Sequence, residues 1–427
     1  MGGFDRQGAA ALYGTAGGTP WLAEERSAAR AAWLVSAWPT RKTEEWKYTS
    51  LEALDNGAWL QVPPIGTQAL DDARIAGLDA DYLVFRNGRF DPQASQFQGG
   101  PGITLSRLAE APEDLRARFG TLAAGSGNPF AALAGCWTED GVVLHLAAGA
   151  RAPRPVCVVH LGGPEAAGCA WAQRLLVVAG PQSSLSLIEY FPAGAAAFVT
   201  GLTEIELQRE AQIHHVRLQL EAEDALHVGG VHIELQQSAV YKGFVLATGS
   251  RLKRLDMRLR HRGAGAEATL DAVYLARRSQ LVDLHTAVFH EAPHCTTREV
   301  CRGIVDDEAR AVFNGRIVIR PGAQKTSADL SNRNLLFSDR AEVDTKPELE
   351  IYADDVKCSH GATVSRIDEK SLYYLRSRGI GRLDAEVLLA FGFVNALFAS
   401  VGSEALKARI DAELRGWFGD RAPEVLA

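Results

Sequence analysis

The sequence predicts a mainly β protein with α-helical regions at both ends. From about residue 140 to residue 355, apolar residues recur at every second position, which is the period of a β-strand. Val142, Leu144 and Leu146 form the first clear example. No convincing amphipathic helix interrupts this long series of short strands, whereas the two ends of the chain show helical periodicity.

The chain length suits several structural units. With 427 residues, about two or three units are expected, with enough sequence to bury a large core. We place an N-terminal helical region with a short hairpin at 1–130, a β core at 131–357 and a C-terminal helical region at 358–427.

The N-terminal region contains one helix signal and one hairpin signal. In residues 21–38, Leu22 and Trp33 fall on one helical face, and Pro39 ends the run. Further on, Asn87-Gly88 lies between apolar residues in LVFRNGRF, which predicts a two-residue β-hairpin.

The β core fits two architectures. Polar residues such as Arg217 and Gln219 alternate with apolar ones, which predicts strands with one buried and one solvated face. An antiparallel sandwich would place tight turns every 8–12 residues or so, but the strands here lie roughly 13–16 residues apart. Asn314-Gly315 is the one obvious tight turn in this region. The spacing favours a parallel solenoid, which needs no hairpins, without excluding the sandwich.

The C-terminal region predicts three helices. Asp368, Asp384 and Ser403 are placed to cap their first turns. The middle helix runs into an uncharged stretch, Val387 to Ser403, that is close to the shortest membrane-spanning length. Its glycines and polar residues, and the charged helices on both sides, favour a helix covered by the β core or by a partner protein.

Composition excludes several classes of protein. The 45 Lys and Arg against 52 Asp and Glu give a formal charge of −7, which argues against nucleic-acid binding. The six cysteines are scattered and contain no CxxC pair, as expected for reduced thiols in a cytoplasmic protein. The opening residues do not resemble a secretory signal, and we expect a protein that is not inserted in a membrane.

Enzyme signatures are missing from the sequence, but two groups could bind a metal. No phosphate-binding P-loop, dinucleotide GxGxxG, HExxH or GxSxG motif is present. Cys358 and His360 follow an acidic stretch, on what reads as a loop before the C-terminal helices. A thiolate and an imidazole are good ligands for iron, copper or zinc, and a His-activated thiol could be a nucleophile. Two ligands do not complete a metal site, so an ordinary Cys and His in a polar turn remains the simpler interpretation.

The second group lies in HEAPHCTTREVC and contains His290, His294, Cys295 and Cys301. Its spacing matches no closed zinc module, and a structural role is favoured. His214, His215 and His232 fall in strand patterns and are expected to face solvent or to have their hydrogen bonds satisfied. Glu350, Asp354 and Asp355 could form a site for a hard cation, but a solvated acidic turn is the more ordinary interpretation.

Three segments resemble one known family. Residues 344–380, DTKPELEIYADDVKCSHGATVSRIDEKSLYYLRSRGI, closely resemble the hallmark of the SufB/SufD family, scaffold subunits of the SUF system for iron–sulfur cluster assembly. The preceding residues 313–347 resemble the family's earlier coils, and residues 39–51, PTRKTEEWKYTSL, its N-terminal segment. Around CSHGAT the chain is similar to the SufD branch rather than the SufB branch.

The resemblance implies a fold and a role. The fold would be a right-handed parallel β-helix flanked by N- and C-terminal α-helical regions. The chain would be a non-catalytic scaffold that pairs with SufB through the β-helix and docks the SufC ATPase through its C-terminal helices. Without SufB, a homodimer is expected. No tightly bound cofactor is implied, only transient iron or a nascent cluster shared with SufB, with His360 as the stronger contributor and Cys358 as the weaker one.

A stand-alone β-helix enzyme is the competing interpretation. It would be a polysaccharide lyase or a thiol-dependent hydrolase that uses Cys358, and it would need a long groove lined by aromatic and acidic residues. The aromatic residues of this sequence are scattered and do not form such a row.

Overall fold

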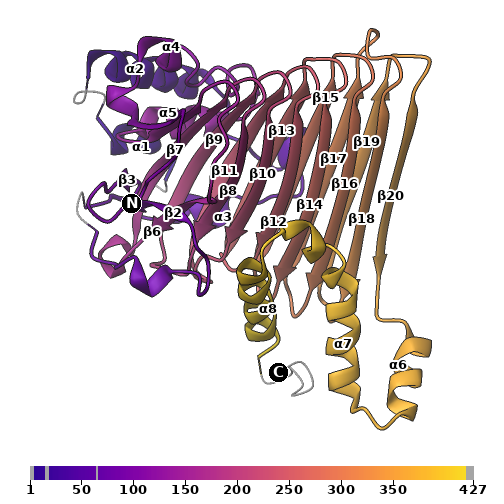
Figure 1. Cartoon of the computed structure of the whole chain (residues 1–427). Helices are drawn as coiled ribbons and strands as arrows, with labels where there is room; N and C mark the ends of the chain where they lie inside the picture. Colours follow the sequence, from indigo (N-terminus) through magenta and orange to yellow (C-terminus); the bar gives the residue numbers. More distant parts are fainter. Residues whose placement is uncertain (1–3, 15–18, 64–65, 420–427) are drawn as a thin grey trace.

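The computed structural model describes residues 4–14, 19–63 and 66–419. Two long sheets run side by side through the molecule, and helices lie at both ends of the chain (Figure 1). The predicted mainly β fold, a parallel β-helix with flanking helical regions, is confirmed.

The strands of each sheet are hydrogen-bonded in the following spatial order. The first sheet contains β19 (Glu342–Ile351), β17 (Arg310–Ile319), β15 (Leu281–His290), β13 (Leu252–His261), β11 (Leu226–Leu235), β9 (Phe198–Leu207), β7 (Cys169–Ala179), β5 (Val142–Leu146) and β4 (Ile103–Arg107), with β1 (Leu60–Gln61) beside β7. The second sheet contains β20 (Lys357–Ser365), β18 (Ser327–Leu336), β16 (Thr296–Val305), β14 (Glu267–Ala276), β12 (Val240–Ala247), β10 (Gln212–Gln219), β8 (Ser184–Phe191), β6 (Val156–Leu161), β2 (Asp81–Arg86) and β3 (Arg89–Phe90).

Parallel pairing decides between the two predicted architectures. From β5 and β6 onward, each strand pairs in parallel with the strand two further along the chain, so the chain winds as a solenoid and the sandwich is excluded. Leu226 pairs with Leu252, which is 252 − 226 = 26 residues on, and Arg310 pairs with Glu342, which is 342 − 310 = 32 residues on. This variable coil length explains why the sequence shows no strict repeat.

One corner of the coil turns through a residue in the left-handed region of the backbone map. The residues with positive φ at this corner are Gln182, Glu210, Ser238, Gly265, His294 and Lys325. Each donates its backbone N–H to a carbonyl of the next coil; for example, His294 N lies 2.9 Å from Gln324 O. These hydrogen bonds extend the ladder around the corner and replace the tight hairpins of an antiparallel sheet.

The helices and 3₁₀ turns lie outside the two sheets. Those that precede β7 in the chain are α1 (Arg6–Leu12), α2 (Pro20–Val35), η1 (Glu44–Trp46), α3 (Glu52–Asp55), η2 (Asp71–Ala73), η3 (Leu108–Glu110), α4 (Glu113–Arg116), α5 (Pro129–Trp137) and η4 (Pro164–Ala166). Those after the coils are α6 (Glu369–Ser377), α7 (Arg382–Asn395), η5 (Phe398–Val401) and α8 (Glu404–Phe418).

The N-terminal signals are confirmed, and one turn prediction is wrong. The predicted helix appears as α2, and Asn87 and Gly88 form the β2–β3 turn with φ values of 51° and 77°. Asn314-Gly315 is not a turn, because both residues lie inside β17. The division at 130 and 357 stays a prediction; α5 and β20 extend across these two positions.

In β10, the face that the sequence predicted to be solvated is the one that points into the core. Arg217 and Gln219 are at most 1% exposed and point into the solenoid, so their predicted place on a solvated face is wrong. Their neighbours Val216 and Leu218 point outward, into an apolar layer shared with α7, η5 and α8. Both faces of this strand are therefore buried, and alternation alone cannot tell which one is inside.

The C-terminal helices follow two of the three predicted caps. The carboxylate of Asp368 accepts from the backbone N–H of Ser371, and Ser403 caps α8. Asp384 is not a cap, since α7 already begins after Gly381. Within the described residues, no helix is long and apolar enough to cross a membrane, and the uncharged stretch is divided between α7 and η5.

Candidate functional site at the open end of the solenoid

The last coil of the solenoid, formed by β19 and β20, is an exposed end. Each of these strands is hydrogen-bonded to one neighbouring strand, and no further strand of the described chain pairs with them (Figure 1). Ile351 and Val364, which would face a following coil, are 45% and 43% exposed. Pro347 in β19 is tolerated because an edge strand does not need every N–H for a ladder. Exposed strand edges of this kind are templates for pairing with another chain.

Cys358 and His360 lie on this open end. They belong to β20, so the prediction that they lie on a loop before the C-terminal helices is wrong. Cys358 pairs with Ala328 and His360 with Leu330, and both partners are buried core residues on the inner face of β18. The two site residues therefore continue inner rows of the solenoid beyond its last covered coil. Cys358 is half-buried against the core, and His360 is exposed.

The surroundings of Cys358 suit a protonated thiol. Burial raises its pKa, and a hydrogen bond with the backbone of Ala328 opposes this only in part. Ser359, on the opposite face of β20, donates its hydroxyl to the carboxylate of Asp329. A thiol whose pKa is raised is a poor nucleophile at neutral pH. The site therefore gives little support to a thiol-dependent hydrolase.

The open end offers two candidate ligands rather than a complete metal site. Side chains at positions i and i+2 of a strand are on the same face, roughly 7 Å apart along the chain. Within the described residues, the one group of three or more converging candidate ligands lies elsewhere. A metal bound by Cys358 and His360 would need further ligands from outside the chain.

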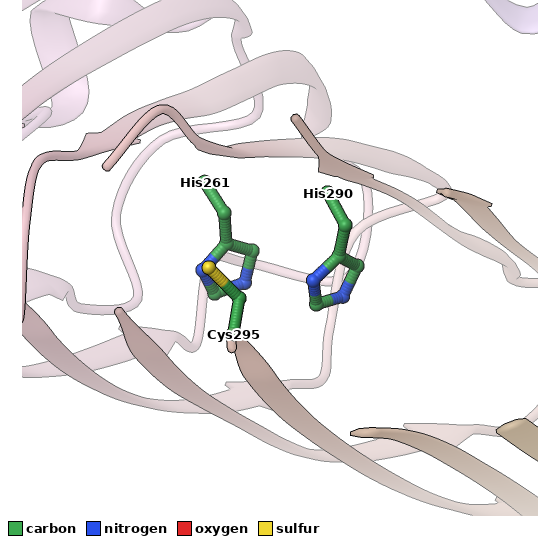
Figure 2. A group of neighbouring side chains, drawn as sticks. All are labelled: His261, His290 and Cys295. Atoms are coloured by element: carbon green, nitrogen blue, oxygen red, sulfur yellow. The ribbon is translucent and has the colours of Figure 1, made fainter. Parts of the chain in front are cut away.

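The group of converging candidate ligands lies inside the solenoid and contains His290 and Cys295 from the second predicted cluster, together with His261. His261, His290 and Cys295 each place one ligand atom within 4.8 Å of the others (Figure 2). His294 is not part of this group, because it is the exposed corner residue of the turn. Cys301 is buried further along β16.

His261 was missed by the sequence because it lies in a different coil. His261 and His290 end β13 and β15 and are paired in register. The two histidines are close because two successive coils pair in register, and coil length varies along the solenoid, so the sequence spacing does not reveal the contact. The sequence signal that could have identified His261 is a His at the last position of each of two strands that pair in register.

Most of the other polar residues that the sequence analysis singled out have protein partners. Nδ1 of His215 lies 2.9 Å from the hydroxyl of Tyr241, its Nε2 lies 3.0 Å from the carboxylate of Glu189, and Nδ1 of His232 lies 3.0 Å from Leu122 O. Two of the acidic residues form ion pairs, Glu350 with Arg316 and Asp355 with Lys325.

A cavity of about 520 Å³ lies away from Cys358 and His360, between the N-terminal segment and the outer face of the first sheet. Several of its charged groups form ion pairs, for example Arg254 with Asp256 and Lys346 with Glu44. Its aromatic lining consists of Trp46 and Phe289, which does not make the aromatic row of a polysaccharide groove.

Comparisons with known proteins agree with this architecture. Residues 163–393 match the family model described as SUF system FeS cluster assembly, SufBD core domain, and residues 13–158 match the SufBD protein N-terminal region. The chain is 32% identical to the iron-sulfur cluster assembly protein SufD of Escherichia coli (strain K12), over 90% of this chain and 89% of that protein. It is 28% identical to the iron-sulfur cluster assembly SufBD family protein slr0076 of Synechocystis, over 87% of this chain and 86% of that protein. It is 26% identical to the chloroplastic protein ABCI7 of Arabidopsis thaliana, over 90% of this chain and 81% of that protein.

Proposed function

The chain is a SufD-type member of the SufBD family, and from this premise we propose that it is a non-catalytic scaffold subunit of SUF iron–sulfur cluster assembly. The observation that carries the proposal is the open end of the solenoid. It combines an unpaired pair of strand edges with two side chains that form an incomplete ligand set. Such an end suits a protein that completes both its sheet and its metal site with a partner.

SufB is the proposed partner at this end. The inner rows of β19 and β20 are only partly covered, and the exposed apolar residues Ile351 and Val364 lie on these rows. A second β-helix that pairs with β19 and β20 would satisfy their free backbone groups and bury these side chains.

Iron or a nascent cluster is the proposed cargo of the shared site. His360, which is exposed on the inner row of β20, is the stronger ligand because it can reach a partner without rearrangement. Cys358 is the weaker ligand, since it is half-buried against the core and its thiol is held protonated. SufB would supply the remaining ligands.

The C-terminal helices are the proposed docking site for the SufC ATPase. The helices α6 and α7 extend beyond the edge of the sheets (Figure 1). Tyr373 and Tyr374 on α6 are 74% and 57% exposed, and Leu383 on α7 is 57% exposed. Exposed aromatic residues of this kind are typical anchors of protein interfaces. Closure of two SufC subunits on ATP would pull these helices, and the stiff solenoid would pass the displacement to the SufB pairing edge.

The test replaces His360 in the complete assembly. The variant His360→Ala, co-expressed with SufB and SufC partners, is expected to lower the rate of cluster formation by roughly tenfold or more, since even residues that only support a ligand change metal affinity by about 10- to 100-fold. Cys358→Ser is expected to have a smaller effect. Cluster formation is followed by absorbance and by iron and sulfide content.

The matched control is Ser359→Ala, on the same strand but with its side chain on the opposite face. It should assemble clusters like the unmodified protein. Unchanged cluster formation by His360→Ala in an intact complex, shown by size-exclusion chromatography, would remove His360 from the mechanism. Turnover of a polysaccharide or thioester by the isolated chain would instead support the enzyme interpretation.

A further inference from the structure

The interior group of His261, His290 and Cys295 brings three candidate metal ligands close together. His261 and His290 come from the ends of two paired strands, and their rings are stacked with centroids 4.3 Å apart and an angle of 11° between the planes. Cys295 lies in the corner just before β16 and faces the same space (Figure 2). All three residues are fully buried. One ligand atom from each lies within 4.8 Å of the others. To bind one ion, the two parallel rings must turn out of their stack until their in-plane lone pairs converge at the roughly 3.5 Å spacing of donors around a metal.

The hydroxyl of Thr297 contacts one nitrogen of each imidazole ring. The hydroxyl oxygen lies 2.8 Å from Nε2 of His261 and 3.1 Å from Nε2 of His290. When both Nε2–H groups donate to this oxygen, both Nδ1 atoms carry free lone pairs. Within the described structure, these two buried Nδ1 atoms have no hydrogen-bond partner. Ligating histidines usually donate their other ring N–H to a neighbouring acceptor, and Thr297 is that acceptor for both rings.

Charge restricts the ion that this group can hold. The next residues in the histidine row are Leu235 and Ile319, which are apolar. A net charge in such surroundings is costly, so the bound ion should be neutralised by its own ligands.

We propose that His261, His290 and Cys295 bind one soft monovalent metal ion, Cu(I), inside the solenoid. Binding replaces the thiol proton of Cys295 with the metal, and that proton leaves to solvent. The resulting thiolate and two neutral imidazoles give a site of zero net charge with Cu(I). Zn(II) or Fe(II) on the same ligands would leave one uncompensated positive charge. Soft thiolate ligands also favour Cu(I).

The ion would join two coils and a corner of the solenoid. It links the ends of β13 and β15 to the turn that begins β16, so binding free energy is added to the stability of the folded chain. This site is separate from Cys358 and His360 in β20, and its occupancy does not depend on the proposed scaffold function.

The experiment measures metal binding by the full-length chain carrying Cys358→Ser, which removes the half-buried thiol of the open end. The protein is refolded anaerobically with Cu(I), Zn(II) or Fe(II) and then separated from excess metal. One equivalent of Cu(I) should remain, with about two nitrogen ligands and one sulfur ligand in its X-ray absorption spectrum, and the melting temperature should rise. His290→Leu and Cys295→Ser, each added to this background, should lose the bound ion and the rise in melting temperature.

The matched control is Cys301→Ser, which alters another fully buried thiol of β16 outside the group. It should keep one equivalent of Cu(I). Circular dichroism of the metal-free proteins shows which variants fold, and Cys295→Ser changes the least volume. Absence of bound Cu(I), unchanged binding in a folded Cys295→Ser variant, or retention of Zn(II) or Fe(II) in preference to Cu(I) would overturn the proposal.

Discussion

Single residues inside the solenoid carry charge, and Glu189 is the clearest example. Its carboxylate accepts from Arg217 at 2.6 Å and from the hydroxyl of Thr203 at 2.7 Å, and His215 lies 3.0 Å away. Burial acts to raise the pKa of Glu189, but Arg217 and His215 outweigh it and hold the pKa well below its usual value. The cluster is tolerated because the charges compensate one another; removing one partner would leave an unpaired buried charge.

His160, beside this cluster, provides a prediction about pH. It stacks on Phe191 with ring centroids 4.3 Å apart, and burial lowers its pKa to about 3. Between about pH 6.5 and pH 3 the unfolded chain binds a proton at this residue and the folded chain does not, so folding stability falls by about 1.4 kcal/mol per pH unit as the pH is lowered. His160→Phe keeps an aromatic ring in the stack and removes this proton, so its unfolding free energy should fall less steeply with acid.

Urea denaturation at several pH values between about 4.5 and 7.5 measures this slope. His294→Asn is the control, since the side chain of His294 is solvated in the folded protein and Asn tolerates the left-handed backbone of that corner. It should leave the slope unchanged. If His160→Phe lost stability with falling pH as steeply as the unmodified protein, the buried neutral imidazole would not be a source of acid sensitivity.

Elements with a local signal were predicted from the sequence, and those set by pairing were not. The α2 helix, the Asn87-Gly88 hairpin and the cap of α8 depend on neighbouring residues, and all three are confirmed. The corners of the coil escaped prediction because their left-handed positions hold Gln, Glu, Ser, His and Lys as well as Gly. Asn314-Gly315 has a local turn signal, but the turn prediction was wrong because parallel pairing with a strand on each side holds these residues in β17.

The candidate site residues also divide into those with a local sequence signal and those brought together only by strand pairing. Cys358 and His360 were identified through a contiguous segment that resembles a family, but their place on a strand required the pairing with β18. His261 joins His290 only through the register between two coils, which a single sequence does not reveal. The inversion of Arg217 arose because α7 and α8 cover the outer face of β10 with a second apolar layer.

At the scale of elements, α6 gives a prediction about partner binding. The double variant Tyr373→Ala and Tyr374→Ala removes two exposed aromatic side chains without opening the core. If α6 docks the ATPase as proposed, affinity for a SufC-type ATPase should fall by about 2 kcal/mol or more, roughly 30-fold in Kd. Isothermal titration calorimetry measures the change.

Tyr352→Ala is the control, because Tyr352 is similarly exposed but lies after β19. Equal affinity of the double variant and the unmodified protein would exclude α6 as the docking site.

The whole molecule is a rod with two different ends. At the beginning, the sheets close with the antiparallel strands β3 and β4, next to the N-terminal helices (Figure 1). At the other end, the parallel ladders stop at β19 and β20 without an antiparallel strand to close them within the described chain. A solenoid usually needs a cap at each end to prevent pairing between edges. This difference between the two ends supports the proposal that the open end pairs with a partner chain.

The open end leads to a prediction about self-association. Without its partner, the chain should form a homodimer through β19 and β20, because the same unpaired edges are available on each copy. In the double variant Ala362→Asp and Val364→Asp, two carboxylates would have to be buried on the inner row of β20, so this variant should be monomeric.

Thr363→Asp is the matched control. Thr363 is on the opposite face of the same strand, paired with Arg333, so the new carboxylate stays solvated and dimerisation persists. Sedimentation velocity over a range of concentrations separates these outcomes. A monomeric unmodified chain, or a double variant that dimerises as the control does, would show that the open end does not pair with a copy of itself.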